Sequence, residues 1–290
     1  MSESTMQPAA PQTLNLDLVG RTLEAPEFTY DWKTCATYAL GIGAGPEELA
    51  YLWEGTPGFH VYPGFAVVPV QGIVMDALAR IGADFRTLVH GEQTLRLHRP
   101  FDRAGVLRST GRVSAVHDKG KAAVVVIDTT THDANGQLVA ETTWSIFCRG
   151  QGGFGGEPGP SPVAVQPLPD APPAFTAQFA TQSTQALLYR LSGDLNPLHV
   201  DPALATRVGF EAPILHGLCS YGFAARALVL HLGGGDPARL RSFSARFSGV
   251  VYPGTIVDLV ARPTDVAGRF AVEARVGDRL VLSHGVAELA

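Results

Sequence analysis

Alternating apolar and polar residues mark two long stretches of the chain as groups of antiparallel strands. Residues 106–148 divide into three such runs, separated by the turn-forming sequences His-Asp-Lys-Gly and Asp-Ala-Asn-Gly. Residues 239–288 divide in the same way into four runs, which Pro and Gly separate. Because the side chains of a strand point alternately to the two faces of a sheet, this pattern predicts a meander of half-buried strands in each stretch.

A more apolar stretch precedes each group of strands. Residues 67–82 and 218–233 have the length of ordinary helices and contain few charges. A helix that is apolar on nearly all sides has to be surrounded by protein. We therefore predict an α+β fold in which each half of the chain curls an antiparallel sheet around one central helix, the hotdog arrangement. Two such units in tandem form a double hotdog.

A segment rich in Gly and Pro separates the two halves. Residues 151–173 contain so many of these residues that neither a helix nor a central strand would persist there. The chain of 290 residues is also longer than a single compact core usually holds. We expect an N-terminal hotdog domain at residues 1–150, a linker at 151–173 and a C-terminal hotdog domain at 174–290.

Aligning the two halves with an offset of about 150 residues supports an internal duplication. Tyr38 then meets Tyr189, and the apolar helical stretches overlap. Three polar residues of the second half have no counterpart in the first: Asp194, Asn196 and His199 fall opposite Gly43, Gly45 and Glu48. Any chemistry that these residues perform is therefore expected once, in the C-terminal half.

Composition excludes several classes of function. The formal net charge is -5 and no basic cluster appears, so nucleic acid is not an expected partner. Cys35, Cys148 and Cys219 are too widely spaced for a disulfide framework or a metal-binding pair. The N-terminal residues lack the pattern of a signal peptide, the apolar stretches fall short of a membrane span, and no peroxisomal Ser-Lys-Leu ends the chain. We expect a cytoplasmic protein that does not enter a membrane.

An acidic residue and a histidine lie close together on a predicted loop. Gly193 allows the chain to leave the preceding helix, and Asn196-Pro197 favours a turn that brings Asp194 and His199 toward one small volume. A carboxylate beside an imidazole can hold a water molecule, remove its proton and return one. Taken alone, the same residues are more often simple turn formers and a partly buried histidine.

A second segment, residues 212–230, adds a site for negative charge. The sequence predicts that Gly217 lies at the start of the long apolar helix, where backbone N–H groups lack intrahelical partners. An N–H at this place can stabilise a developing oxyanion. An acid/base pair and an oxyanion donor within about 25 residues of each other are less easily explained by turn chemistry alone.

The motifs YRLSGDLNPLHVDP and ILHGLCSYG resemble the signature of the MaoC-like, type 2 enoyl-CoA hydratases, which include the hydratase part of peroxisomal multifunctional enzyme type 2. Segments of the first half, YALGIGAG, LVHGEQTLRLHRPFDRAG, HDKGKAAVVVIDTTTHD and FCRGQGGFGG, also resemble successive segments of that family. The resemblance thus covers nearly the whole chain.

The resemblance implies an (R)-specific hydratase that interconverts trans-2-enoyl-CoA and (3R)-3-hydroxyacyl-CoA without a metal or other cofactor. It assigns catalysis to Asp194 and His199, placement of the water to Asn196, the oxyanion N–H to Gly217, and contacts with coenzyme A to Ser220 and Arg246. The first half would have lost its own catalytic pair and would accommodate the acyl chain. By the same analogy we expect a homodimer.

Three other functions remain open at this point. A thioesterase of the same fold would direct the water at the thioester carbonyl carbon. A metal-dependent hydrolase would use the ligand types present in Asp194, His199, Asp201 and His216, although their spacing matches no standard set. A non-catalytic acyl-CoA-binding partner subunit is the third alternative, because one half already lacks a site.

Other notable residues are expected to be structural. Tryptophans are more often core residues than cofactor-stacking ones, and we expect this of Trp32, Trp53 and Trp144. His90 has no acidic partner nearby in the sequence, and Cys219 has no base spaced for a thiol nucleophile. We expect His90 to be structural and Cys219 to be a small buried residue.

Overall fold

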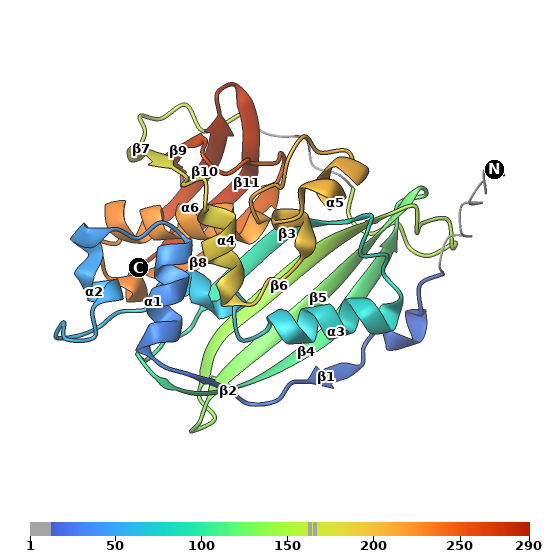
Figure 1. The fold of residues 1–290 in the computed structure, drawn as a ribbon, viewed down its shortest axis with the longest axis horizontal. Coiled ribbons are helices and arrows are strands. Elements are labelled where there is room, and N and C mark those ends of the chain that lie inside the picture. Colours follow the sequence, from blue (N-terminus) through green and yellow to red (C-terminus); the bar gives the residue numbers. More distant parts are fainter. Residues whose placement is uncertain (1–12, 162–163, 165–166) are drawn as a thin grey trace.

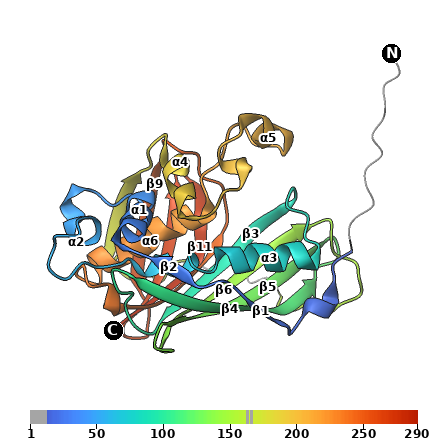
Figure 2. The ribbon, with the colours of Figure 1, turned by 60° about the horizontal axis from the view of Figure 1, so that its bottom comes forward.

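The first half of the chain forms a curved antiparallel sheet with a helix against its inner face (Figures 1 and 2). The computed structural model describes residues 13–161, 164 and 167–290. The first half contains β1 (Thr22–Glu24), β2 (Phe28–Tyr30), α1 (Trp32–Gly41), α2 (Leu49–Leu52), α3 (Gln71–Ile81), β3 (Leu88–Leu97), β4 (Gly105–Asp118), β5 (Ala122–Asp133) and β6 (Leu138–Arg149). The meander expected at 106–148 is confirmed as β4, β5 and β6.

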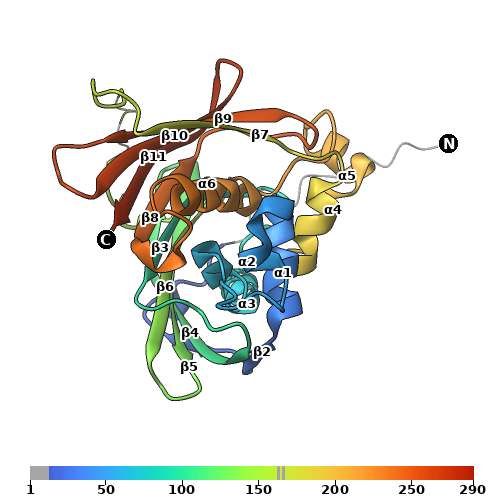
Figure 3. The same cartoon turned by 90° about the vertical axis from the view of Figure 1, so that its left-hand side faces the viewer.

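The second half repeats this plan. It contains β7 (Phe175–Ala180), α4 (Gln185–Tyr189), α5 (Pro202–Arg207), α6 (Gly217–His231), β8 (Leu240–Phe247), β9 (Ile256–Pro263), β10 (Arg269–Val276) and β11 (Arg279–Leu289). The strands expected at 239–288 are confirmed as β8 to β11. Helix α6 crosses the inner face of this sheet, and in Figure 3 α3 is seen end on beneath it. The fold is the predicted double hotdog.

The two sheets join edge to edge into one. The strand order is β1-β4-β5-β6-β3-β8-β11-β10-β9-β7, so β3 and β8 form the junction. At its centre Thr94 lies opposite Ser244, two residues whose numbers differ by 150. The rings of Tyr38 and Tyr189 also meet, with their centroids 6.2 Å apart. Residues that the duplication pairs therefore face each other about a local two-fold axis, which the sequence did not reveal.

Helix α6 is buried as its composition predicted, whereas α3 buries six of its eleven residues and leaves Ala79 and Arg80 exposed. Helix α3 ends where Gly82 adopts the left-handed conformation, with φ of 82°, which glycine takes without steric cost. Eleven of the fifteen residues of α6 are buried. Ala77-Leu78 of α3 and their aligned partners Ala227-Leu228 of α6 are all fully inaccessible to solvent. Each pair thus occupies the centre of its own half, as a duplication requires.

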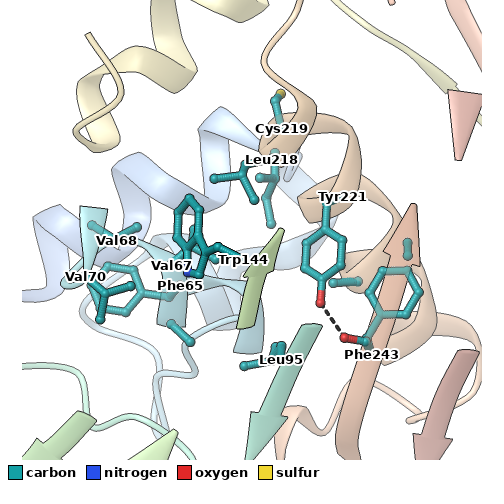
Figure 4. Packing of buried hydrophobic residues seen from close by; sticks show 14 of the residues in the cluster. Phe65, Val67, Val68, Val70, Leu95, Trp144, Leu218, Cys219, Tyr221 and Phe243 are labelled. Atoms are coloured by element: carbon teal, nitrogen blue, oxygen red, sulfur yellow. Dashed lines mark hydrogen bonds between the residues drawn. The ribbon is translucent and has the colours of Figure 1, made fainter. Parts of the chain in front are cut away.

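A continuous core connects the halves. Figure 4 shows Trp144 and Leu95 of the first sheet near Tyr221 and Phe243 of the second half. The hydroxyl of buried Tyr221 donates to the backbone carbonyl of Phe243 at 2.6 Å, so its polar atom is satisfied. One hydrophobic core spans both halves. The halves are therefore not separate domains joined only by a flexible linker.

The segment at 151–173 contains no helix or strand in its described part, and it packs against the first sheet. The Asp118 carboxylate accepts hydrogen bonds from the backbone N–H groups of Gly153 and Gly155, each at 2.8 Å. These hydrogen bonds lower the pKa of Asp118 below its usual value. The ammonium group of Lys119 donates to the carbonyl of Pro160. Residues 162–163 and 165–166 lie outside the described part.

Two sequence-based expectations need correction. The segment Pro63–Ile81 has the length and apolarity of a membrane span, although we expected no stretch to reach that limit. About two thirds of it is buried inside the protein, so here it serves as a core segment. Trp53 was expected in the core but is 53% exposed, because it lies just beyond the short helix α2. Trp144 is buried as expected.

Candidate active site

A short loop after α4 carries Asp194 and His199. Gly193, with φ of 117°, ends the helical turn that follows α4. The Asp194 carboxylate then accepts from the Asn196 N–H at 3.2 Å, and the Asn196 side-chain oxygen accepts from the Leu198 N–H at 3.0 Å. From the sequence, we expected such contacts if these residues only form a turn. The same contacts also fix the positions of Asp194 and His199.

The tautomer of His199 is set by the backbone. Its Nδ1 lies 2.8 Å from the carbonyl oxygen of Ile214, which can only accept, so Nδ1 carries the proton and Nε2 of the neutral ring is a proton acceptor. Only 9% of the side chain is exposed. Burial lowers the pKa of the imidazole below 6.5, while the negative charge of Asp194 acts in the opposite direction.

His216 joins these two residues and completes a three-residue cluster. Its ring stacks on that of His199 with centroids 3.7 Å apart, and its Nε2–H donates to the backbone carbonyl of Asp194 at 3.2 Å. One ligand-type atom from each of Asp194, His199 and His216 lies within 4.8 Å of the other two. Burial, with a smaller effect of His199, lowers the pKa of His216 to about 2. His216 is therefore a neutral ring that holds the pair in place.

Of the four residues considered as metal ligands, the structure brings together three. Asp201 is the exception, because its carboxylate accepts from the Ala203 N–H and begins helix α5. Sequence reasoning did not identify the packing of His216 on His199. The available signal was its position directly before Gly217, at the start of the apolar helix.

Gly217 is the first residue of α6, as predicted. His216 precedes it in an extended conformation and provides no side-chain cap, so the first N–H groups of the helix lack that partner. A Cβ atom at Gly217 would lie 3.2 Å from the Phe247 ring. Glycine thus leaves the helix N-terminus open for close approach of an acceptor atom, which its positive end favours.

A cavity of about 760 Å³ adjoins this cluster and is lined by both halves of the chain. The predicted residues Asn196, His199, Gly217, Ser220 and Arg246 all line it. Asp194 does not form part of the wall, so His199 is the member of the pair that faces the cavity. The first half contributes both apolar and polar or charged side chains: Leu88, Val89, Val124, Val126 and Phe147, and His90, Glu92, His117, Lys119, Ser145 and Arg149.

The residues expected to contact coenzyme A occupy different parts of this wall. Ser220 lies in the first turn of α6 and is nearly buried. Arg246 forms an ion pair with Glu92, with a nitrogen-oxygen distance of 2.6 Å. Glu92 and Arg246 are also the last pair of residues in the register between β3 and β8. Glu92 was not identified from the sequence, because its partner is supplied only by the junction of the sheets.

His90 and Cys219 have different positions relative to the cavity. The His90 ring lines the cavity and stacks on Trp144, with centroids 5.0 Å apart, and burial lowers its pKa to about 4. Cys219 is a buried small residue, as expected, and its thiol donates to the Gly41 carbonyl. Burial raises the pKa of that thiol well above its usual value, which removes thiolate character.

The counterpart of the catalytic loop in the first half is filled by a buried ion pair. Glu48, aligned with His199, accepts hydrogen bonds from Arg226 of α6 and from the Tyr62 hydroxyl. Both oxygens of the carboxylate are engaged, since the Gly45 N–H donates to Glu48 as well. This position therefore connects the halves and leaves no base available for catalysis.

The fold and site together define a double hotdog protein with one acid/base cluster and one open helix N-terminus in its C-terminal half. Residues 28–150 match the family described as MFE-2 hydratase 2 N-terminal domain, and residues 164–282 match the MaoC like domain. The chain belongs to the MaoC-like hydratase and dehydratase family.

Individual relatives agree with this assignment. The 3-hydroxyacyl-thioester dehydratase Y of Mycobacterium tuberculosis is 42% identical, over 93% of this chain and 96% of that protein. The probable enoyl-CoA hydratase 2 of Dictyostelium discoideum is 34% identical, over 93% of this chain and 94% of that protein. The crystal structure of a MaoC-like dehydratase from Phytophthora capsici superposes with a TM-score of 0.83 at 32% identity, covering 96% of this chain and 99% of that one.

Proposed function

We propose that this protein is an (R)-specific enoyl-CoA hydratase, which reversibly adds water to trans-2-enoyl-CoA and yields (3R)-3-hydroxyacyl-CoA. The observation that carries the proposal is the buried His199, which has Nε2 as its proton acceptor and lines the same cavity as Gly217 at the open N-terminus of α6. The names of the relatives from M. tuberculosis and D. discoideum support the same reaction, while the (R) configuration rests on the family resemblance.

The N-terminus of α6 activates the substrate. In the proposed complex the thioester oxygen accepts a hydrogen bond from the Gly217 N–H, and the positive end of the helix adds to this interaction. Withdrawal of electrons toward this oxygen makes C3 of the conjugated double bond electrophilic. The negative charge that develops during addition is then located where the donor already lies.

The His199 and Asp194 pair handles the protons. Nε2 of His199 accepts a proton from water as the water oxygen bonds to C3, and the nearby carboxylate of Asp194 stabilises the imidazolium that forms. The pair then returns one proton to C2 on the same face. One oxygen-carbon and one hydrogen-carbon bond form, one water is consumed, and both residues recover their starting state. This chemistry requires no metal or organic cofactor.

Asn196 has a more restricted role than its residue type allows. Its side-chain oxygen already accepts from the Leu198 N–H, while its amide nitrogen can donate toward a water in the cavity. We propose that Asn196 both shapes the loop and orients the water. Ser220 and Arg246 remain the proposed contacts of coenzyme A, with Arg246 held by Glu92 at the junction of the sheets.

Assembly and location are also proposals. The three cysteines are free and buried, which suits a reducing compartment, and we propose a cytoplasmic location. Leu187, Leu191 and Leu195 are each more than half exposed beside the catalytic loop, and an apolar row of this kind is often covered by another subunit. We propose a homodimer, which a molar mass measured in solution would test.

The deciding experiment combines hydration of trans-2-enoyl-CoA substrates of increasing chain length with chiral analysis of the products. We expect loss of the conjugated enoyl-thioester absorbance, formation of the (3R) product and no free thiol. Release of thiol with the double bond intact would instead identify a thioesterase. Unchanged substrate at high protein concentration would identify a non-catalytic binding protein.

A further inference from the structure

A hydrogen-bonded chain of three side chains lies beside the cavity and takes no part in the proposed proton chemistry. The hydroxyl oxygens of Ser248 and Ser283 are 2.5 Å apart. Ser283 Oγ lies 2.9 Å from Nδ1 of His284, and Nε2 of His284 lies 3.2 Å from the backbone carbonyl of Ala164. Ser248 lines the cavity, so this chain runs from the cavity to the segment that connects the halves.

The direction of every hydrogen bond in this chain follows from its far end. A carbonyl oxygen can only accept, so Nε2 of His284 carries a proton, and in a ring with a single proton Nδ1 is then an acceptor. Ser283 therefore donates its O–H to His284, and Ser248 donates its own O–H to Ser283. What Ser248 presents to the cavity is then the remaining acceptor capacity of its oxygen, without a proton.

The backbone at His284 adopts an unfavourable conformation in this arrangement. His284 has φ of 50° and is the sole non-glycine residue with a positive φ in the described part of the chain. Such a conformation is unfavourable for an ordinary side chain and tends to occur where function requires it. It coincides with a bulge between Ser283 and Val286 in the pairing of β11 with β8. Ser283 is completely buried, so its hydroxyl has little freedom to reorient.

Ser248 lines the same cavity as Gly217, the proposed donor to the thioester oxygen. It follows Phe247, which also lines the cavity and whose ring would be 3.2 Å from a Cβ atom at Gly217. Pairing of β3 with β8 ends at Glu92 and Arg246, two residues before Ser248, and residues of both strands at this end line the cavity.

We propose that Ser248 accepts a hydrogen bond from the amide N–H nearest the sulfur in the pantetheine arm of the substrate. This inference rests on the proposed function. The pantetheine arm carries a secondary amide two carbons from sulfur, so this amide follows the thioester into the cavity that Ser248 and Gly217 both line. An acceptor that has its own proton directed inward selects an N–H and disfavours a carbonyl or ether oxygen at that point.

The test compares two small substrates. One is the crotonyl thioester of N-acetylcysteamine, and the other is the crotonyl 4-oxopentyl thioester, in which a methylene replaces the amide N–H. We expect the wild-type protein to prefer the first in kcat/KM by about 2- to 13-fold, the usual range for one neutral hydrogen bond. Ser248→Ala should lose this preference by slowing the amide substrate alone.

Two further variants complete the design. Ser242→Ala is the matched control, because Ser242 lies on the same strand β8 but bonds Glu288 and does not line the cavity. It should retain the wild-type preference. Ser283→Ala removes the acceptor that holds the Ser248 proton and should reduce the preference without changing the 4-oxopentyl rate.

The outcomes separate the inference from the proposed function. An equal effect of Ser248→Ala on both substrates, or none on either, would overturn the role of Ser248 while hydration by the wild-type protein still supports the hydratase. Absence of hydration of every enoyl thioester by the wild-type protein would overturn both. Melting temperatures of all variants, which we expect to agree with wild type, exclude a general loss of structure.

Discussion

The imidazole rings of His199 and His216 stack with centroids 3.7 Å apart, and backbone carbonyls hold one nitrogen of each ring. His199 donates to Ile214 and His216 donates to Asp194, so the backbone determines which nitrogen of each neutral ring is protonated. The remaining nitrogen of His199 is thereby kept as a base.

The acid/base pair should be essential. We expect His199→Gln and Asp194→Asn to lower kcat by roughly 100- to 10,000-fold, the usual range for general acid/base groups, with a smaller change in KM. Asp201→Asn is the matched control, since Asp201 lies just beyond the same loop but only caps α5. Initial rates of hydration measure the effect. Near-normal turnover in either of the first two variants would contradict the proposed mechanism.

The oxyanion donor can be removed without breaking the helix. Proline is tolerated at the first position of a helix, and His216 already has the extended conformation that proline requires before it. Gly217→Pro should therefore eliminate the N–H and lower kcat by about 100- to 1000-fold. Gly217→Ala keeps the N–H but places a methyl group near Phe247. If both variants lose the same activity, crowding would explain the loss and the N–H would not.

The pH profile should show an ascending limb below pH 6.5. Catalysis needs unprotonated His199, and burial lowers its pKa from 6.5, so kcat/KM should rise with pH and level off before that value is passed. The negative charge of Asp194 raises this pKa. Asp194→Asn should consequently move the limb to lower pH as well as reduce the maximum. A shift toward higher pH would contradict the assigned charges.

Acid should destabilise the protein through its buried histidines. The pKa values of His90 and His216 are lowered to about 4 and about 2 in the folded state. Below pH 6.5 the unfolded chain binds protons that the folded chain excludes, so stability falls as pH decreases. Each such group contributes a slope of about 1.4 kcal/mol per pH unit in that window. Urea unfolding between pH 7 and pH 5 measures it, and His216→Asn should flatten the slope.

The ion pair between Glu48 and Arg226 should stabilise the junction of the halves. Glu48→Ala leaves a buried guanidinium without its partner, which typically costs about 3–5 kcal/mol of unfolding free energy. Glu48→Leu combined with Arg226→Met should recover most of this loss. Burial alone would raise the pKa of Glu48, but hydrogen bonds from Arg226 and Tyr62 hold it below 4.5. The stabilisation should therefore be complete above pH 4.5 and decline as the pH falls below it.

Removal of metal ions should leave activity unchanged. Asp194, His199 and His216 present ligand-type atoms close together, so dialysis against a chelator is a meaningful test. We expect the dialysed protein to hydrate crotonyl-CoA at the original rate. Loss of activity that added Zn²⁺ or Mn²⁺ restores would favour the metal-dependent hydrolase.

Local patterns predicted much of this structure. Hydrophobic periodicity located both central helices and the strands β4 to β6 and β8 to β11, because side-chain spacing within one element decides which face is buried. The loop around Asp194 was predictable for a similar reason, since Gly193 and the Asn196-Pro197 turn act over a few residues. The offset of about 150 residues was also visible in the sequence. The sequence did not show that residues paired by this offset face each other in the structure.

The sequence pattern did not predict the contacts between residues that are far apart in the chain. The pairing of β3 with β8 joins Glu92 to Arg246, two residues far apart in the chain with no local pattern that relates them. The stacking of His216 on His199 and the chain from Ser248 to His284 depend on the same tertiary packing. Composition correctly predicted that the described part of 151–173 contains no helix or strand, but the packing of that segment on the sheet depends on Asp118, a residue far from it in the chain.

The two walls of the cavity meet where β3 pairs with β8 and belong to one polypeptide, so assembly of the cavity does not depend on protein concentration. Walls supplied by two separate polypeptides would come apart on dilution, whereas covalent linkage keeps the halves at a high effective concentration. One acid/base cluster therefore serves a cavity that both halves line, while the aligned position of the first half holds the ion pair of Glu48 and Arg226, which joins the halves.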